Sequence, residues 1–296
     1  ERLNANPWLT GQIQVPAEGT ILPDTYEIAR GESRQAVLDR MQAAMTATLA
    51  ELWPTKGPRS VVNSPREALI LAVDRDGFSD AVTARLEAHP NIAIDRTEVT
   101  ISQFERYAQA TGTVTRAEKE GGGFEYGAGW ERRPGWSWRQ PDGVQARADL
   151  PAVHLDFAEA QAYCRWAGGR LPTGAEWQKA GFTELRDAPP APWVKGRTYP
   201  WSTGDSPQGA NTSEPDPWPR AAPARATRQG VNGLYDMGAN VWEWTTDARG
   251  QERRTVGGSW WYGAFNMKAD VMAFKPADFY AVYIGFRCVY DLKAPS

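Results

Sequence analysis

Side chains that redox metals prefer as ligands are scarce in this sequence. Its 296 residues include two cysteines, Cys164 and Cys288, and two histidines, His89 and His154. Thiolates bind copper and imidazoles bind iron. An iron site made of three histidines is excluded, because the chain has only two. The residues alone suggest that the cysteines are buried thiols that pack as small hydrophobes and that His154 is a core or supporting residue. We expect Arg287, whose guanidinium stays protonated, to brace the fold.

An aromatic segment near the C-terminus holds the other side chains with chemical potential. It reads WWYGAFNMKADVMAFKPADFYAVY over residues 260–283. Such a segment can stack a ring or a sugar and fix it with a few polar contacts, or it can be ordinary packing. The predicted ligand pocket comprises Trp260, Trp261, Tyr262, Lys268, Asp270, Asp278 and Tyr283, with Lys275 beside them.

Charge and hydropathy narrow the choice of partners. The net charge is -3, and lysine and arginine are scattered along the chain. Because no basic stripe is available to neutralise phosphates, we expect no nucleic-acid partner. No apolar run approaches the roughly 18 to 20 residues that span a bilayer, so we expect no membrane span. A protein or a small-molecule ligand is the expected partner.

The elements that position these residues are predicted to be short and joined by loops. Glycine (28), proline (22) and tryptophan (14) are abundant, which is typical of a loop-rich fold with aromatic plugs. Ile92, Ile94 and Val99 indicate a buried strand. The proline-rich stretch 187–226 is expected to be loop.

Three helices are predicted from their N-terminal caps. Thr100 is expected to cap one helix. Asp156 and Thr173 precede two others, expected over residues 157–166 and 174–180, and each has a glutamate three positions later. This spacing is typical of a capping box.

The first third of the chain is expected to be a separate N-terminal helical segment, residues 1–91. Ser33 precedes a run of apolar residues at helical spacing that ends near Leu52. A second short helix is expected over residues 64–71, and residues 71–91 are predicted to form an amphipathic helix followed by a turn at His89 and Pro90.

Three stretches near the C-terminus resemble the formylglycine-generating enzymes, the sulfatase-modifying factor family. They read GVNGLYDMGANVWEWTTD, VGGSWWYGAF and YIGFRC, and the likeness continues in the family's order over residues 92–293. The resemblance implies one domain with an α+β, loop-rich, C-type-lectin-like fold and little regular secondary structure.

Two other resemblances fall in the N-terminal third. Within residues 1–72, NANPWLTG, VPAEGTILPDTYEIARGESRQAVLDRM and SPREALILA resemble part of the endolytic murein transglycosylases. That family's catalytic glutamate would follow residues 68–72, where this chain has VDRDG. Because a general acid must be correctly placed, we predict no glycan cleavage. Residues 71–91 resemble a fragment of the folate-dependent tRNA methyltransferases, without a cofactor motif.

The main resemblance has two consequences for sulfur chemistry. It implies a structural disulfide between Cys164 and Cys288, which would place maturation in an oxidising compartment, periplasmic or secreted. The copper-binding cysteine pair of the family would fall where Met267, Lys268 and Met272 stand here. Since a thioether cannot form a thiolate, we expect no copper and no formylglycine generation.

Calcium is the cofactor that the resemblance favours, because carboxylate, amide and carbonyl oxygens can bind it and order loops. One implied ligand set comprises the side chains of Asn240 and Glu243 and the carbonyls of Ala239 and Val241. A second comprises the side chains of Asn211 and Asp216 and the carbonyls of Thr212 and Trp218. The alternative is that these polar groups cap turns around core tryptophans.

The family resemblance without its cysteine pair suggests an accessory protein or a ligand- or protein-recognition protein. One alternative is a periplasmic oxidase or maturation enzyme of the siderophore-maturation type. Another is a diversified binding protein whose variable residues lie between GGSW and IGFR.

Overall fold

The computed structural model describes residues 92–291 in full and, before them, the backbone of five short strands. Strand β1 (Arg2–Leu3) pairs with β2 (Ile13–Gln14), and β3 (Ile21–Leu22) pairs with β4 (Tyr26–Glu27). The helix predicted to end near Leu52 lies outside the described residues, as do residues 64–69 and 74–91 of the other two predicted helices.

Strand β5 (Ile70–Val73) corrects the sequence analysis. Residues 70–73 were expected in helices, but they pair in parallel with β6 (Ile92–Asp95). The run ILAV contains two β-branched residues, which suit a strand. The helix prediction fails because the partner strand lies about twenty residues further along the chain, and local spacing does not reveal it.

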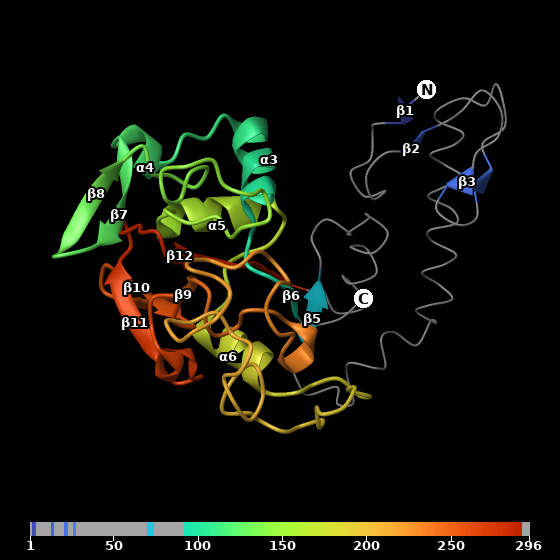
Figure 1. The fold of residues 1–296 in the computed structure, drawn as a ribbon. Coiled ribbons are helices and arrows are strands. Elements are labelled where there is room, and N and C mark those ends of the chain that lie inside the picture. The colour runs from blue at the N-terminus through green and yellow to red at the C-terminus, as the bar shows by residue number, and fades with distance from the viewer. Residues whose placement is uncertain are drawn as a thin grey trace.

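The remaining strands form separate small sheets around irregular loops (Figure 1). The three-stranded sheet has the order β13-β6-β5, and the four-stranded sheet has the order β11-β10-β9-β12. A third sheet is the antiparallel hairpin β7-β8. The bounds are β7 (Gly122–Tyr126), β8 (Trp130–Pro134), β9 (Trp242–Arg249), β10 (Glu252–Val256), β11 (Met272–Pro276), β12 (Ile284–Gly285) and β13 (Val289–Asp291). The fold is α+β and loop-rich, as predicted.

The predicted helix caps are confirmed. Thr100, Asp156 and Thr173 each accept a hydrogen bond from the backbone three residues on, and each forms a capping box. They begin α3 (Ile101–Thr111), α5 (Phe157–Trp166) and α6 (Gly174–Phe182). The other helical segments within residues 92–291 are α4 (Arg116–Lys119) and the 3-10 turns η2 (Val231–Gly233) and η3 (Ala264–Met267). Helix α6 is two residues longer than predicted. Residues 187–226 contain no helix or named strand, which confirms the loop prediction.

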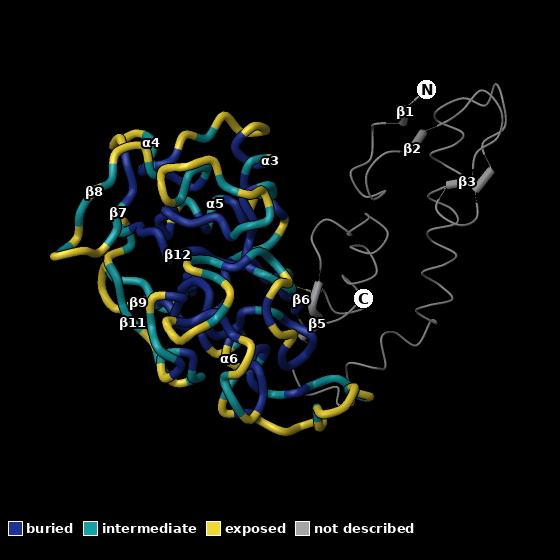
Figure 2. The backbone as a smooth tube through the Cα atoms, viewed as in Figure 1, coloured by how far each residue is buried: buried dark blue, intermediate teal, exposed yellow. Residues whose placement is uncertain are grey.

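Aromatic rings fill the core between α3, α5 and the strands. Phe104 contacts four of them, Tyr107, Trp138, Tyr163 and Phe286, with centroids 5.0 to 6.5 Å apart. Figure 2 shows the buried backbone gathered at α5 and the central strands, with exposed residues in the loops. Among the described helices, none is both long and apolar enough to cross a bilayer.

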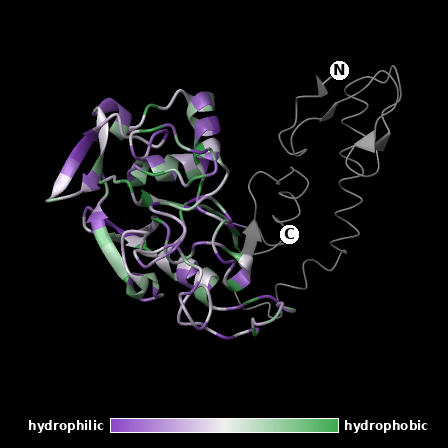
Figure 3. Cartoon of the chain, viewed as in Figure 1, coloured by the Kyte–Doolittle hydropathy of each residue, from purple (hydrophilic) through white to green (hydrophobic). Residues whose placement is uncertain are grey.

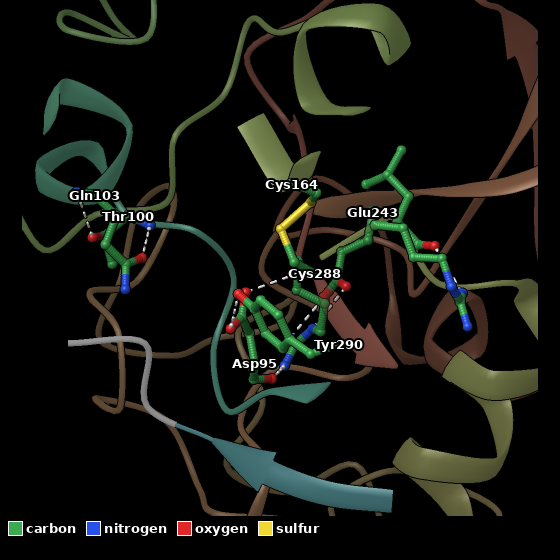
Figure 4. The surroundings of a disulfide bond; sticks show 10 residues. Asp95, Thr100, Gln103, Cys164, Glu243, Cys288 and Tyr290 are labelled. Atoms are coloured by element: carbon green, nitrogen blue, oxygen red, sulfur yellow. Dashed lines mark hydrogen bonds and ion pairs between the residues drawn. A yellow bond between two sulfur atoms is a disulfide. The ribbon is translucent and has the colours of Figure 1, made fainter. Parts of the chain in front are cut away.

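The predicted disulfide is present between Cys164, in α5, and Cys288, which directly precedes β13 (Figure 4). Both residues are fully buried. Beside the bridge, the carboxylate of Asp95 accepts hydrogen bonds from the Cys288 amide and the Tyr290 hydroxyl, each at 3.0 Å. The bridge therefore joins the helix layer to the sheet at the end of β6.

Arg287 braces the interior through a buried ion pair. Its guanidinium donates to both carboxylate oxygens of Glu243, at 2.8 and 2.7 Å, and both side chains have no exposed surface. Arg287 also donates to the carbonyls of Asp95 and Tyr235, and Glu243 accepts the indole N–H of Trp177 at 2.9 Å. The pair thus connects β6, α6, β9 and two loops.

Two further carboxylates lie buried near this pair. Burial, followed by repulsion from Asp236, raises the pKa of Glu98 well above its ordinary value. Burial also raises the pKa of Asp236 to about 6. Both shifts have the same cause, since burial penalises the charged form of a carboxyl group.

We predict that Glu243→Gln lowers the free energy of unfolding by about 3–5 kcal/mol, because it leaves the Arg287 charge buried without a counterion. Urea denaturation followed by circular dichroism measures the change. Glu252→Gln is the matched control, since Glu252 pairs with Arg249 at the surface and exposed pairs contribute about 1 kcal/mol or less. Equal effects of the two substitutions would contradict this account of the fold.

Reduction of the disulfide should destabilise the protein by about 4–5 kcal/mol on the chain-entropy estimate, because the bridge closes a loop with a sequence separation of 124. Urea denaturation with and without dithiothreitol measures this, with the Cys164→Ala/Cys288→Ala double variant as the control that should not respond to reductant. Intact mass should rise by two hydrogens on reduction. An unfolding midpoint that dithiothreitol leaves unchanged would refute the expected stabilisation.

Candidate functional site

Aromatic side chains form a continuous cluster on one side of the domain. Tyr283 lies at its centre, with ring centroids 5.9 Å from Trp130, 6.4 Å from Trp261 and 5.8 Å from Tyr262. We use the name aromatic cluster for Tyr126, Trp130, Trp242, Trp261, Tyr262, Phe279 and Tyr283, each of which contacts at least one other member.

The aromatic cluster has a buried floor and an exposed rim. Tyr283 and Trp242 are 2% and 3% exposed, whereas Tyr126, Trp130 and Trp261 are 45%, 43% and 36% exposed. Large rings are seldom left in water together without a function. The exposed faces of two indoles beside a buried tyrosine offer a surface on which a planar group can stack.

The β7-β8 hairpin supplies one side of this rim. Tyr126 and Trp130 face each other across its turn, and the Phe124 carbonyl accepts a hydrogen bond from the Val282 amide at 3.0 Å. Figure 3 shows that β8 is otherwise largely hydrophilic. The β7-β8 hairpin is thus amphipathic, and a backbone hydrogen bond joins it to the segment that carries Tyr283.

Close packing behind the hairpin requires a glycine at position 123. A Cβ there would lie 2.2 Å from Nδ1 of His154. The imidazole is fully buried, and burial lowers the pKa of His154 to about 4. His154 is therefore a neutral core residue that seats the hairpin, as the sequence suggested.

Polar groups approach the aromatic cluster from β11 and from within it. The ammonium of Lys275 lies 5.3 Å from the centroid of the Trp242 ring, and burial lowers the pKa of Lys275. The hydroxyls of Tyr262 and Tyr283 lie 3.4 Å apart. Burial, together with this contact, raises the pKa of Tyr283, so this phenol stays protonated.

The structure divides the residues of the predicted ligand pocket. Trp261, Tyr262 and Tyr283 belong to the aromatic cluster, and Trp260 contacts Trp261 at 5.2 Å. The charged residues of the predicted pocket do not belong to the aromatic cluster. Lys268 lies over Trp201 and Phe265, Asp278 pairs with Arg116 at 3.4 Å, and Asp270 is exposed in a turn before β11.

Four members of the aromatic cluster were not assigned to the pocket from sequence, namely Tyr126, Trp130, Trp242 and Phe279. Tyr126 and Trp130 lie more than 120 residues before the predicted segment, Trp242 also precedes it, and Phe279 lies within it but was not among the predicted pocket residues. The signal for Tyr126 and Trp130 was the pattern FEYGAGWERRP, in which aromatic residues flank a glycine-containing turn. Such a pattern predicts a hairpin, but it does not show where the hairpin docks.

The first implied calcium set does not fit an ion. Both oxygens of Glu243 already accept from Arg287. The side-chain oxygen of Asn240 accepts from the Asn211 amide group and the Ala222 backbone, at 2.9 and 2.7 Å. The two side chains predicted to bind this calcium ion are thus engaged in internal hydrogen bonds in this structure.

In the second implied calcium set, one side-chain oxygen lacks an internal partner. The side-chain oxygen of Asn211 is buried without a hydrogen-bond partner, although its amide nitrogen donates to Arg220 and Asn240. Nearby, the Asp216 carboxylate accepts from the backbone of Thr212 and Trp218. A cavity of about 800 Å³ is lined by Thr212, Asp216 and Trp218, so hard oxygen ligands border an open space. No cluster of three His, Cys, Asp or Glu is found within the described residues.

Comparison with known proteins finds a matching family model, similar relatives and a similar solved structure. A family model described as the sulfatase-modifying factor enzyme 1-like domain matches residues 65–292. The formylglycine-generating enzyme of Streptomyces coelicolor is 32% identical over 248 residues, covering 69% of this chain and 75% of its own. The inactive C-alpha-formylglycine-generating enzyme 2 of Mus musculus is 29% identical over 297 residues, covering 83% and 93%. The structure of PvdO from Pseudomonas aeruginosa aligns with a TM-score of 0.49 at 21% identity, covering 67% and 80%.

Proposed function

Because this chain belongs to the sulfatase-modifying factor enzyme 1-like family, we propose that it is a non-catalytic member that recognises a protein or small-molecule ligand through the aromatic cluster. The observation that carries the proposal is that both cysteines of the chain are joined in a buried disulfide. The family scaffold is retained, while the side chains for thiol-based oxidation are committed to holding it together.

The disulfide argues against formylglycine generation because that reaction needs thiol groups. A thiolate is needed both to hold copper and to engage the cysteine of a substrate. Met267, in the segment where the family's thiols fall, is buried and has a thioether that cannot deprotonate. Cys164 and Cys288 lie in the core and would have to break the bridge between α5 and β13 to act as ligands.

The relatives bear on the non-catalytic part of the proposal. Some similar proteins are named formylglycine-generating enzyme, and one similar protein from Mus musculus is named inactive C-alpha-formylglycine-generating enzyme 2. The latter shows that a chain of this family can exist without the activity. The exposed rings of the aromatic cluster supply a surface on which such a protein can bind a ligand.

The proposed location follows from the disulfide. Structural disulfides persist in oxidising compartments, which supports a periplasmic or secreted protein. The siderophore-maturation type of oxidase and the diversified binding protein remain predictions from the sequence.

We predict that the purified protein, incubated with copper and a cysteine-containing sulfatase peptide in air, leaves the peptide mass unchanged. The reason is the lack of a free thiol in the chain. Mass spectrometry of the peptide measures the outcome, with the Streptomyces coelicolor enzyme as the positive control. Appearance of the aldehyde product would overturn the non-catalytic proposal.

We further propose calcium at the second ligand set, Asn211, Asp216 and the carbonyls of Thr212 and Trp218. Bound calcium would supply a hard positive charge that ties these loop oxygens together. The support is the buried, unpartnered oxygen of Asn211, together with the cavity that Thr212, Asp216 and Trp218 line.

Calcium should raise the melting temperature of the wild type, because a ligand at about 100 times its Kd stabilises by about 2.7 kcal/mol. Asp216→Asn should abolish this response. Asp205→Asn is the control, since Asp205 forms an exposed pair with Arg197. Scanning calorimetry with calcium, magnesium or EGTA measures the shift, and a wild type that is insensitive to calcium would contradict the proposed site.

A further inference from the structure

We infer that the ligand of the aromatic cluster is an aromatic carboxylate, with the carboxylate held by the Lys275 ammonium and the Trp242 indole N–H, and the ring held by the exposed indoles. This inference rests on the proposed recognition function and specifies the chemistry of its ligand. Three observations support it: a half-buried charge without a counterion, unpartnered indole donors, and exposed aromatic rings beside them.

Lys275 is a cation without an anion. Its ammonium faces the Trp242 ring at 5.3 Å, and no carboxylate within the described part of the chain forms an ion pair with it. Burial lowers its pKa, so the folded protein loses solvation of this charge with only a cation–π contact in return. An anion supplied from outside would complete the pairing.

The indole N–H of Trp242 is a second donor without an acceptor. Trp242 is 3% exposed, and its Nε1 has no hydrogen-bond partner. Other buried tryptophans of this protein do have acceptors: Trp138 donates to Glu118, Trp177 to Glu243 and Trp244 to the Leu155 carbonyl. Buried indoles normally find such partners.

The buried tryptophans without an acceptor lie in the aromatic cluster or next to it. Besides Trp242, the only one in the described residues is Trp260, which contacts Trp261 of the aromatic cluster. The unmet groups here are all donors, so the complementary ligand group is an acceptor. A carboxylate has two oxygens and a negative charge, which match one indole N–H and one ammonium.

The aromatic cluster connects this polar end to the exposed rings. Trp242 contacts Tyr262 at 5.7 Å, Tyr262 contacts Tyr283 at 5.8 Å, and Tyr283 lies between Trp130 and Trp261. A ligand with its ring on these indoles and its carboxylate near Lys275 needs a short chain between the two. Indole-3-butyrate has this form, and its neutral amide has nearly the same shape.

The test is isothermal titration calorimetry of indole-3-butyrate and indole-3-butyramide at pH 7.5 and low salt. The wild type should bind the acid at least tenfold more tightly than the amide, since charge-assisted hydrogen bonds are the stronger ones. Lys275→Met should remove this preference, and Lys275→Arg should keep most of it. Trp242→Phe should weaken the acid several-fold while retaining the ring. Lys119→Met, on an exposed lysine of α4, should behave as the wild type.

Two outcomes would overturn the inference. Equal binding of acid and amide by the wild type would show that the aromatic cluster binds rings without reading charge, which leaves the recognition function standing. Binding of neither compound would also overturn it, and the recognition function would then depend on a different ligand class. Circular dichroism of each variant separates loss of binding from loss of fold.

Discussion

The loops of this domain depend on the buried pair between Glu243 and Arg287. Much of the stretch 92–291 runs outside helices and strands, so few backbone ladders fix its path. The pair contacts β6, β9, α6 and the loop at Tyr235 through five hydrogen bonds. Desolvation of two charges is costly, and it is offset because nearly every polar atom finds a partner. A paired arginine therefore fixes segments that hydrophobic contact alone would leave free to slide.

The disulfide adds a covalent constraint next to this electrostatic one. Cys288 directly follows Arg287, so adjacent residues anchor the same strand end to α5 and to β9. The two cysteines serve structure because their burial removes them from any substrate. The cysteines therefore stabilise the family fold through a disulfide. The exposed surface that could bind a ligand consists of aromatic side chains.

Sequence reasoning succeeded where the determining interactions are local. The caps at Thr100, Asp156 and Thr173 are set by side chains three residues apart, and all three helices begin where predicted. It failed at Ile70 and Leu71, whose strand pairing comes from residues further along the chain. The family resemblance supplied the disulfide, which spacing alone does not specify.

The site was harder to predict for the same physical reason. Four aromatic members of the predicted pocket lie together because they share one segment, but Trp130 reaches them through a hairpin docked across the chain. Glu243 was expected to bind metal, and its role as partner of Arg287 depends on two residues 44 positions apart. Residue type indicates what a side chain can do, whereas its partners decide what it does.

Satisfied and unsatisfied polar groups together define where this molecule meets its surroundings. In the core, Trp177 and Trp244 donate to internal acceptors, and the Asn240 side chain is saturated. Folding tolerates few unpaired buried donors, because each costs roughly 1–3 kcal/mol when water is removed. Trp242 and Lys275 break this pattern next to the exposed rings of the aromatic cluster. The other buried indoles away from this surface are paired, whereas the Trp242 indole and the Lys275 ammonium lack acceptors. Donors without acceptors beside exposed rings are the groups that an anion-binding site needs.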